Sequence, residues 1–105
     1  MLKFPADPKV CETIDSLTKW ISKRALPEKI VLFGSHARGD ANQKSDIDIA
    51  VFGKECSEQE WTQLVLDIEE NPFTLLKIDL IEADKVQGEF KKRINEEGRI
   101  LYAKK

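Results

Sequence analysis

A pair of aspartates in an otherwise apolar segment constrains this 105-residue chain more than any other feature. The segment 45–53, SDIDIAVFG, predicts a strand that begins at Ser45 and carries Asp46 and Asp48. Because successive side chains on a strand point to opposite faces, the two carboxylates share one face and the isoleucines share the other. The carboxylates are roughly 7 Å apart along the strand, a spacing from which both can bind one hard cation. We therefore expect a strand that buries its apolar face and presents a metal-binding face.

Another strand and a tight turn precede this pair. The apolar run 30–33 predicts a short strand that is buried on both faces. Gly34 and Ser35 end that strand, and ten residues separate Ser35 from Asp46. Glycine permits a tight turn and lets a ligand approach the backbone, whose amides, with the serine hydroxyl, can hold a phosphate oxygen. Gly39 would allow the following loop to bend again.

The rest of the chain predicts elements that would cover and extend this sheet. Asp7 is a suitable N-cap for a helix that runs to about Ala25. Ser57 and Glu60 have the spacing of a capping box at the start of another helix, in which Trp61 belongs to the buried stripe. Further expected elements are a strand at 75–81, a helix at 85–97 and a strand at 99–102. The fold class is therefore α/β in the broad sense (α+β), a mixed sheet of about four strands with helices packed mainly on one face.

The strand expected at 75–81 supplies a further acid. Its apolar side chains at alternate positions point one way, while Lys77 and Asp79 point the other. An acid in the middle of an apolar strand needs a partner or a metal ion if it is buried. Asp79 is therefore the candidate third carboxylate, and an edge-strand aspartate that faces water is the alternative interpretation. Glu82 and Asp84 are its rivals, but both lie where the next helix is expected to begin.

Composition narrows the function classes. The 17 basic and 19 acidic side chains nearly cancel, which disfavours nucleic acid as a partner because a general nucleic-acid binder has a broad positive field. Cys11 and Cys56 have no metal-ligand spacing and do not make a disulfide framework, so we expect a reducing, cytoplasmic location. No apolar run approaches the ~20 residues needed to span a bilayer, so no membrane association is expected. The length predicts a single small domain over 1–105.

The segment 34–53, GSHARGDANQKSDIDIAVFG, resembles the signature of the nucleotidyltransferase superfamily whose best-known member is DNA polymerase beta. More closely, the chain resembles the minimal nucleotidyltransferases, the MNT family, which occur in prokaryotes as partners of HEPN proteins. The segments KIDLIEA at 77–83 and INEEGRILY at 94–102 match the family's third acidic strand and its typical ending. The resemblance spans about three quarters of the chain and implies the nucleotidyltransferase fold.

The resemblance also implies catalytic and metal-binding roles for three carboxylates. Asp46 and Asp48 would hold two Mg²⁺ ions, which neutralise a triphosphate and the leaving pyrophosphate. Asp79 would complete the second metal site and could accept the proton of the attacking hydroxyl.

A further set of residues would bind ATP. The cofactor-binding residues implied by the resemblance are Gly34, Ser35, Arg38, Gly39 and Ser45. Arg38 either adds a positive charge to the phosphates or is an ordinary exposed loop arginine. His36 occupies a variable position of the signature, which favours a surface or phosphate-edge contact over a catalytic role.

The kind of molecule that accepts the nucleotide is inferred from the lack of further domains and from the resemblance. Polymerase-like members carry further domains that bind the acceptor, and this chain has none, so its acceptor is small or is presented by another protein. The resemblance implies an antitoxin that transfers AMP from ATP to a tyrosine of a HEPN ribonuclease toxin, which is protein AMPylation. Two alternatives remain open. One is a nucleotidyltransferase of small molecules such as aminoglycosides, and the other is a non-catalytic antitoxin that neutralises its partner by binding.

Overall fold

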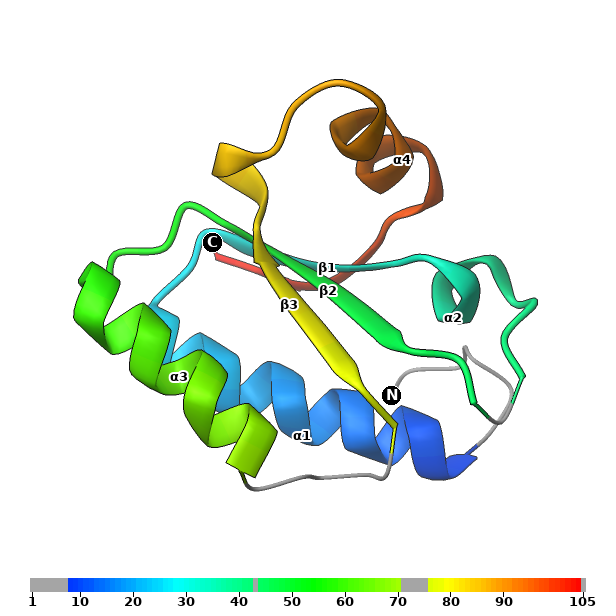
Figure 1. The fold of residues 1–105 in the computed structure, drawn as a ribbon, viewed down its shortest axis with the longest axis horizontal. Coiled ribbons are helices and arrows are strands. Elements are labelled where there is room, and N and C mark those ends of the chain that lie inside the picture. Colours follow the sequence, from blue (N-terminus) through cyan, green and yellow to red (C-terminus); the bar gives the residue numbers. More distant parts are fainter. Residues whose placement is uncertain (1–7, 43, 71–75, 105) are drawn as a thin grey trace.

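The computed structural model describes residues 8–42, 44–70 and 76–104, which form a mixed four-stranded sheet between two layers of helix (Figure 1). The strands are β1 (Lys29–Phe33), β2 (Ile47–Phe52), β3 (Ile78–Glu82) and β4 (Arg99–Ala103), in the order β3-β2-β1-β4. The central strand β1 is antiparallel to both β2 and β4, whereas β2 and β3 are parallel. The expected mixed sheet is therefore confirmed, with β3 at one edge.

The helices are divided unequally between the two faces of the sheet. The two longest, α1 (Pro8–Ala25) and α3 (Glu58–Glu70), lie side by side on one face, as expected (Figure 1). The opposite face carries the 3₁₀ turn η1 (Ala83–Lys85) and α4 (Glu89–Glu97). The single-turn helix α2 (Ser35–Arg38) lies at the end of the sheet, between β1 and β2 in the chain. No helix in the described part of the chain is long and apolar enough to span a membrane.

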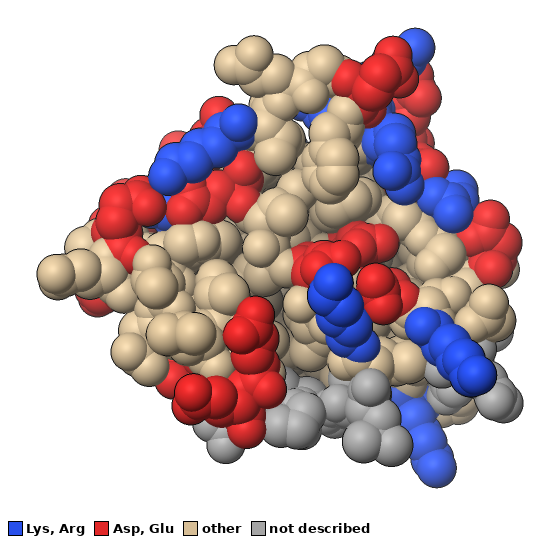
Figure 2. Space-filling view, in the orientation of Figure 1, with Lys and Arg blue, Asp and Glu red and all other residues tan. Residues whose placement is uncertain are grey.

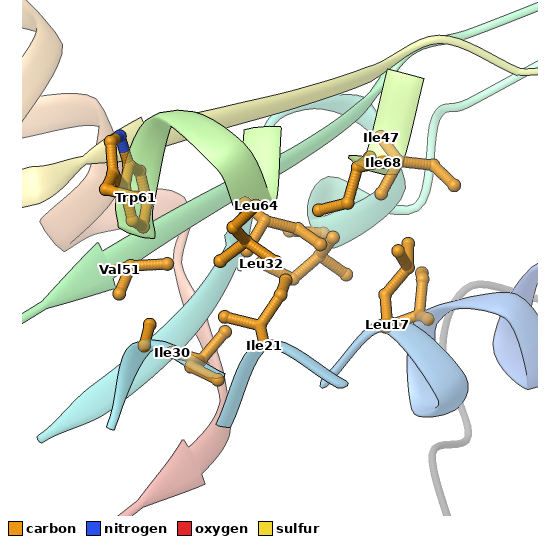
Figure 3. Close-up of a cluster of buried hydrophobic side chains, with 13 residues drawn as sticks. Leu17, Ile21, Ile30, Leu32, Ile47, Val51, Trp61, Leu64 and Ile68 are labelled. Carbon is orange, nitrogen blue, oxygen red and sulfur yellow. The ribbon is translucent and has the colours of Figure 1, made fainter. Parts of the chain in front are cut away.

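Alternating burial along the strands separates two apolar clusters. The larger cluster joins α1 and α3 to the sheet (Figure 3), and its labelled members are Leu17, Ile21, Ile30, Leu32, Ile47, Val51, Trp61, Leu64 and Ile68. Trp61 is buried in this cluster, as the helical spacing predicts, and Trp20 packs against its edge. The smaller cluster lies under α4 and contains Val31, Phe33, Ala50, Ala83 and Ile94. Each central strand is thus buried on both faces.

Local sequence signals set most of the element ends. The capping box at the start of α3 is present: the Glu60 amide donates to Ser57 Oγ at 3.1 Å, and the Ser57 amide donates to Glu60 Oε1 at 3.0 Å. The last helix begins at Glu89 and not at Lys85, because Gly88 has a φ of 66° and leaves the helical region. The segment before it is a 3₁₀ turn anchored by Asp84 Oδ2, which accepts a hydrogen bond from the Gly53 amide at 2.7 Å.

Two sequence expectations fall at the limits of the described chain. The expected N-cap Asp7 and the first residue of the strand expected at 75–81 lie outside the described residues. The strand expected at 75–81 is observed from Ile78 to Glu82. The final strand extends from Arg99 to Ala103, one residue beyond the expected end.

Candidate active site

Two carboxyl groups meet where β2 and β3 run side by side. Asp48 is directly opposite Asp79 in the parallel register. The neighbours Ile47 and Ile49 are buried against α1 and α3, so the alternation of side chains directs Asp48 to the face that carries α4. Ile78 and Leu80 likewise pack on the large cluster and leave Asp79 on the same face as Asp48. The expected alternation is observed for Asp48 and Asp79 and brings the two acids together, whereas β2 begins at Ile47 and not at Ser45, so that Asp46 precedes the strand.

The environment of Asp48 favours the uncharged carboxyl. Its pKa is raised to about 6, first by burial and then by the negative charges of Asp79 and Asp46. A hydrogen bond with Asp79 adds to the increase, and the positive charge of Arg93 opposes it. The Asp48 carboxyl is thus close enough to two other carboxyl groups to be repelled by both, and the positive charge of Arg93 does not compensate for them. A bound cation would stabilise the ionised form of these carboxyl groups.

Gly34 packs its backbone directly against the Asp48 carboxyl. The residue has a φ of 77°, a conformation that side chains with a Cβ rarely adopt. A Cβ at this position would also overlap Asp48 Oδ2 and lie 3.1 Å from Asp48 Cγ. Glycine is therefore required for two independent reasons. The sequence predicts that Gly34 allows a close approach to its backbone, and the approaching group in the structure is Asp48.

The expected turn after β1 is the start of α2. The Ala37 and Arg38 amides donate to the Gly34 carbonyl oxygen at 3.1 and 3.0 Å. Gly39 ends the helix in the left-handed conformation, with a φ of 89°. Ser35 is half-buried and directly follows the glycine that contacts Asp48. The first turn of α2 therefore stands at the mouth of the carboxylate pair.

A family comparison accounts for this arrangement. The model of the family described as polymerase beta, nucleotidyltransferase matches residues 15–105, which include Gly34, Asp48 and Asp79. This chain belongs to that family. A relative from Methanocaldococcus jannaschii, named as a candidate protein adenylyltransferase, is 35% identical over 82 residues, which cover 75% of this chain and 82% of the relative.

Solved structures share the fold of this nucleotidyltransferase. A structure described as a minimal nucleotidyltransferase has a TM-score of 0.68 at 20% identity and covers 90% of this chain and 96% of its own. A toxin–antitoxin structure with AMP-PNP has a TM-score of 0.63 at 21% identity, covering 86% of this chain and 73% of its own. A mutant of the toxin–antitoxin pair MntA–HpeT has a TM-score of 0.62 at 22% identity, covering 89% of this chain and 72% of its own. The nucleotidyltransferase fold expected from the sequence is confirmed.

His36 of this nucleotidyltransferase is buried, and the expectation of a surface or phosphate-edge contact is wrong. Its side chain is only 3% exposed. Since a carbonyl oxygen can only accept, Nε2 donates the hydrogen bond to the Ser45 carbonyl oxygen at 3.1 Å. Ser45 in turn accepts from the Asn42 amide through Oγ at 2.9 Å. His36 thus ties α2 to the start of β2 and sets the position of the chain that leads into Asp46 and Asp48.

Arg38 lies in the same loop and is half-exposed, at 38% of its side chain. Its guanidinium group pairs with Asp40 at 3.1 Å and with Glu97 of α4 at 2.8 Å. These hydrogen bonds raise the pKa of Arg38. Glu97 is not among the predicted site residues, because its partner Arg38 lies far away in the chain.

Glu82 and Asp84, the other candidates for the third carboxylate, bind other partners. Glu82 lies at the far end of β3 and forms ion pairs with Lys85 at 2.8 Å and Lys54 at 3.9 Å. Asp84 binds the Gly53 amide. Only Asp79 of these three acids stands opposite Asp48, and its side chain is 42% exposed with Lys77 at 3.5 Å. On the face of the molecule that Figure 2 shows, carboxylates gather near the middle, with basic side chains beside them.

The donor set suits a divalent cation that also binds substrate phosphates. Among residues 8–42, 44–70 and 76–104, no three His, Cys, Asp or Glu side chains form a ready metal-binding group. Asp48 nevertheless has two carboxylates close enough to raise its pKa, and all of these ligands are oxygen atoms. Magnesium usually binds through one or two carboxylates and completes its shell with water and phosphate oxygens. The residues present therefore fit magnesium bound together with a nucleoside triphosphate.

Proposed function

We propose that this nucleotidyltransferase transfers AMP from ATP to a hydroxyl group of a partner protein, a tyrosine of a HEPN ribonuclease toxin, and so acts as the antitoxin. The observation that carries the proposal is the Asp48–Asp79 pair held against the backbone of Gly34. The relative named as a candidate protein adenylyltransferase supports AMP and a protein acceptor. The toxin–antitoxin structures of the same fold support a toxin as the partner.

In this proposal the residues of the site have separate roles in binding metal ions and phosphates. Asp46 and Asp48 would hold two magnesium ions, and Asp79 would complete the site of the second. Bound magnesium supplies charge neutralisation of the phosphates and a lower pKa for the acceptor hydroxyl. Ser35 and the adjacent backbone at Gly34 bind the β- and γ-phosphates, while the backbone turn at Gly39 and the Ser45 contact shape the loop around them.

The transfer itself is a displacement at the α-phosphorus of ATP. The acceptor oxygen forms a bond to the α-phosphorus, the bond to the bridging oxygen of the β-phosphate breaks, and pyrophosphate leaves. Asp79, whose side chain is 42% exposed, accepts the hydroxyl proton. Asp48, with a pKa of about 6, is mainly ionised at neutral pH and contributes charge to the site.

The position of Asp79 in the sheet favours a macromolecular acceptor. Strand β3 is an edge strand, so a partner can approach it from the side.

The intact mass of the partner protein tests the proposal. The partner encoded or co-purified with this chain is incubated with the purified protein, magnesium and each nucleoside triphosphate in turn. We expect a mass gain of one or more AMP units with ATP, which is absent when Asp46→Asn/Asp48→Asn replaces the wild type. Asp15→Asn on α1 is the matched control, since it removes a carboxylate from a helix that covers the other face.

Two results would overturn this proposal and separate the alternatives. An unchanged partner mass together with tight, metal-independent binding would identify a non-catalytic antitoxin. Modification of a small hydroxylated compound such as an aminoglycoside by the isolated protein, with no change to the partner, would identify a small-molecule nucleotidyltransferase.

A further inference from the structure

Helix α4 borders the carboxylate site through one of its faces. Ile94 is buried toward the sheet. Phe90 contacts Phe33 edge to face, with ring centroids 5.6 Å apart and planes inclined by 74°. Phe33 is directly opposite Asp48 in the antiparallel pairing of β1 and β2. The face of α4 that carries Phe90 therefore lies over the part of the sheet that carries Asp48.

Arg93 lies on this face, one turn after Phe90. Residues three apart on a helix are neighbours on its surface, so Arg93 and Phe90 point to the same side. Arg93 is close enough for its positive charge to act on the Asp48 carboxyl. The Arg93 side chain is 49% exposed and is therefore accessible to a ligand that enters from solvent.

Glu97 links Arg93 to Arg38. Its Oε2 lies 2.8 Å from Arg38 Nη1, and its Oε1 lies 3.7 Å from Arg93 Nε. The Glu97 side chain is only 20% exposed, and its buried Oε1 has no hydrogen-bond partner among the described residues. One carboxylate of α4 thus holds two guanidinium groups, one from α2 firmly and one from its own helix through a longer ion pair.

Two arginines in this position meet a requirement of the proposed reaction. A triphosphate must approach three carboxylates, so positive charge beyond that of bound cations favours its binding. A planar guanidinium group can bind two phosphate oxygens at once, which gives both attraction and orientation. We infer that Arg93 and Arg38 form a two-arginine clamp, held by Glu97, that binds the triphosphate of the incoming nucleotide beside Asp48. This inference rests on the proposed function and assigns Arg93 as a substrate-binding residue and Glu97 as a positioning residue.

Nucleotide affinity in the presence of magnesium tests the clamp. Calorimetric titrations with ATP, inorganic tripolyphosphate and adenosine are compared for the wild type and Arg93→Gln. We expect Arg93→Gln to weaken ATP and tripolyphosphate binding by the same factor, at least about tenfold, because a charge-assisted contact to phosphate is lost. Adenosine affinity should be unchanged, and Arg93→Lys should restore part of the tripolyphosphate affinity.

Lys92→Gln is the matched control on the same helix. Lys92 points away from the sheet, is 64% exposed and pairs at 3.9 Å with the equally exposed Glu96. Its replacement removes the same charge from α4 and should leave all three affinities unchanged. Folded Arg93→Gln that binds ATP as tightly as the wild type would overturn the clamp alone. A wild type that binds neither ATP nor tripolyphosphate would overturn the proposed function, and the clamp with it.

The positioning role of Glu97 requires a separate comparison. Glu97→Gln should weaken tripolyphosphate binding in the wild-type background and have no further effect in Arg38→Gln/Arg93→Gln, since its action passes through those side chains. If Glu97→Gln weakened binding by the same factor in both backgrounds, its role would be structural and the positioning assignment would be wrong.

Discussion

Asp48 and Asp79 stand opposite each other in the parallel pairing of β2 with β3, and their charges repel across the two strands. Like charges directly opposite each other destabilise a sheet. Apolar residues on both sides of each acid fix the register, so the strands cannot relieve the repulsion by a shift of one residue. The folded protein therefore retains an unfavourable pair at the place where a cation would be most favoured.

Asp48→Asn should stabilise the protein at neutral pH. The folded state raises the pKa of Asp48 from 3.8 to about 6. Its contribution to stability is therefore fully present below about pH 4 and is lost as the pH rises through about 6. The free energy of unfolding at pH 7.5 should increase by on the order of 2 kcal/mol in Asp48→Asn, with no gain at about pH 4. Urea denaturation at both pH values measures the difference, and equal stability of variant and wild type at pH 7.5 would contradict it.

Gly34→Ala should cost more stability than Gly39→Ala. Both glycines have a positive φ, but a Cβ at Gly39 meets no atom within 4 Å, whereas one at Gly34 overlaps the Asp48 carboxyl. The comparison therefore isolates the steric conflict, which should add about 1–3 kcal/mol. Chemical denaturation measures both variants. Gly34→Ala/Asp48→Ala should recover most of that extra cost, and failure to do so would show that backbone conformation alone requires glycine.

His36→Phe should loosen the loop that leads into β2. The substitution keeps an aromatic ring but leaves the Ser45 carbonyl oxygen without its donor, which should cost about 1–3 kcal/mol. Hydrogen exchange at the Asn42 and Ser45 amides, which pair with each other's oxygen atoms, should accelerate. Thr13→Val, which removes an exposed hydrogen bond on α1, is the control and should leave these amides unchanged. Unchanged exchange in His36→Phe would show that the loop does not depend on this contact.

Asp79→Asn and Glu82→Gln should have opposite effects on activity and stability. Asp79→Asn removes the proposed proton acceptor and should lower the rate of AMP transfer at least about a hundredfold while the protein remains folded. Glu82→Gln removes the partner of Lys85 and Lys54 at the far end of β3 and should retain transfer at a cost in stability. Transfer rates and melting temperatures of both variants, measured side by side, decide the assignment. If Asp79→Asn retained AMP transfer, Glu82 would again be a candidate for the third carboxylate.

The parts of the site that follow local periodicity could be predicted from the sequence. Strand alternation predicted the face of Asp48 and separated Asp79 from its apolar neighbours, whereas Asp46 precedes β2, which begins at Ile47. Which strands pair, and in which register, depends on long-range packing, so the direct opposition of Asp48 and Asp79 could not be derived from spacing alone. Helix α3 was predictable at its start, because the capping box from Ser57 to Glu60 is a local signal.

The parts that depend on distant contacts were missed. His36 reads as an ordinary loop residue until the fold brings it to the Ser45 carbonyl oxygen. The pairing of Arg38 with Glu97 joins α2 to α4 and has no local signature. Phe90 is 40% exposed, and Ile94 is the buried residue of α4, a helix that begins later than the sequence predicts.

The parallel pairing of β3 with β2 also determines the order in which the site can assemble. Strands β1 and β2 are antiparallel neighbours along the chain and can pair early, whereas β3 reaches β2 only after the crossover through α3. We therefore expect Asp48 to meet Asp79 later in folding than β1 meets β2. In the proposed reaction, a nascent chain that carries the whole glycine, serine and aspartate signature lacks its third carboxylate until the edge strand has docked.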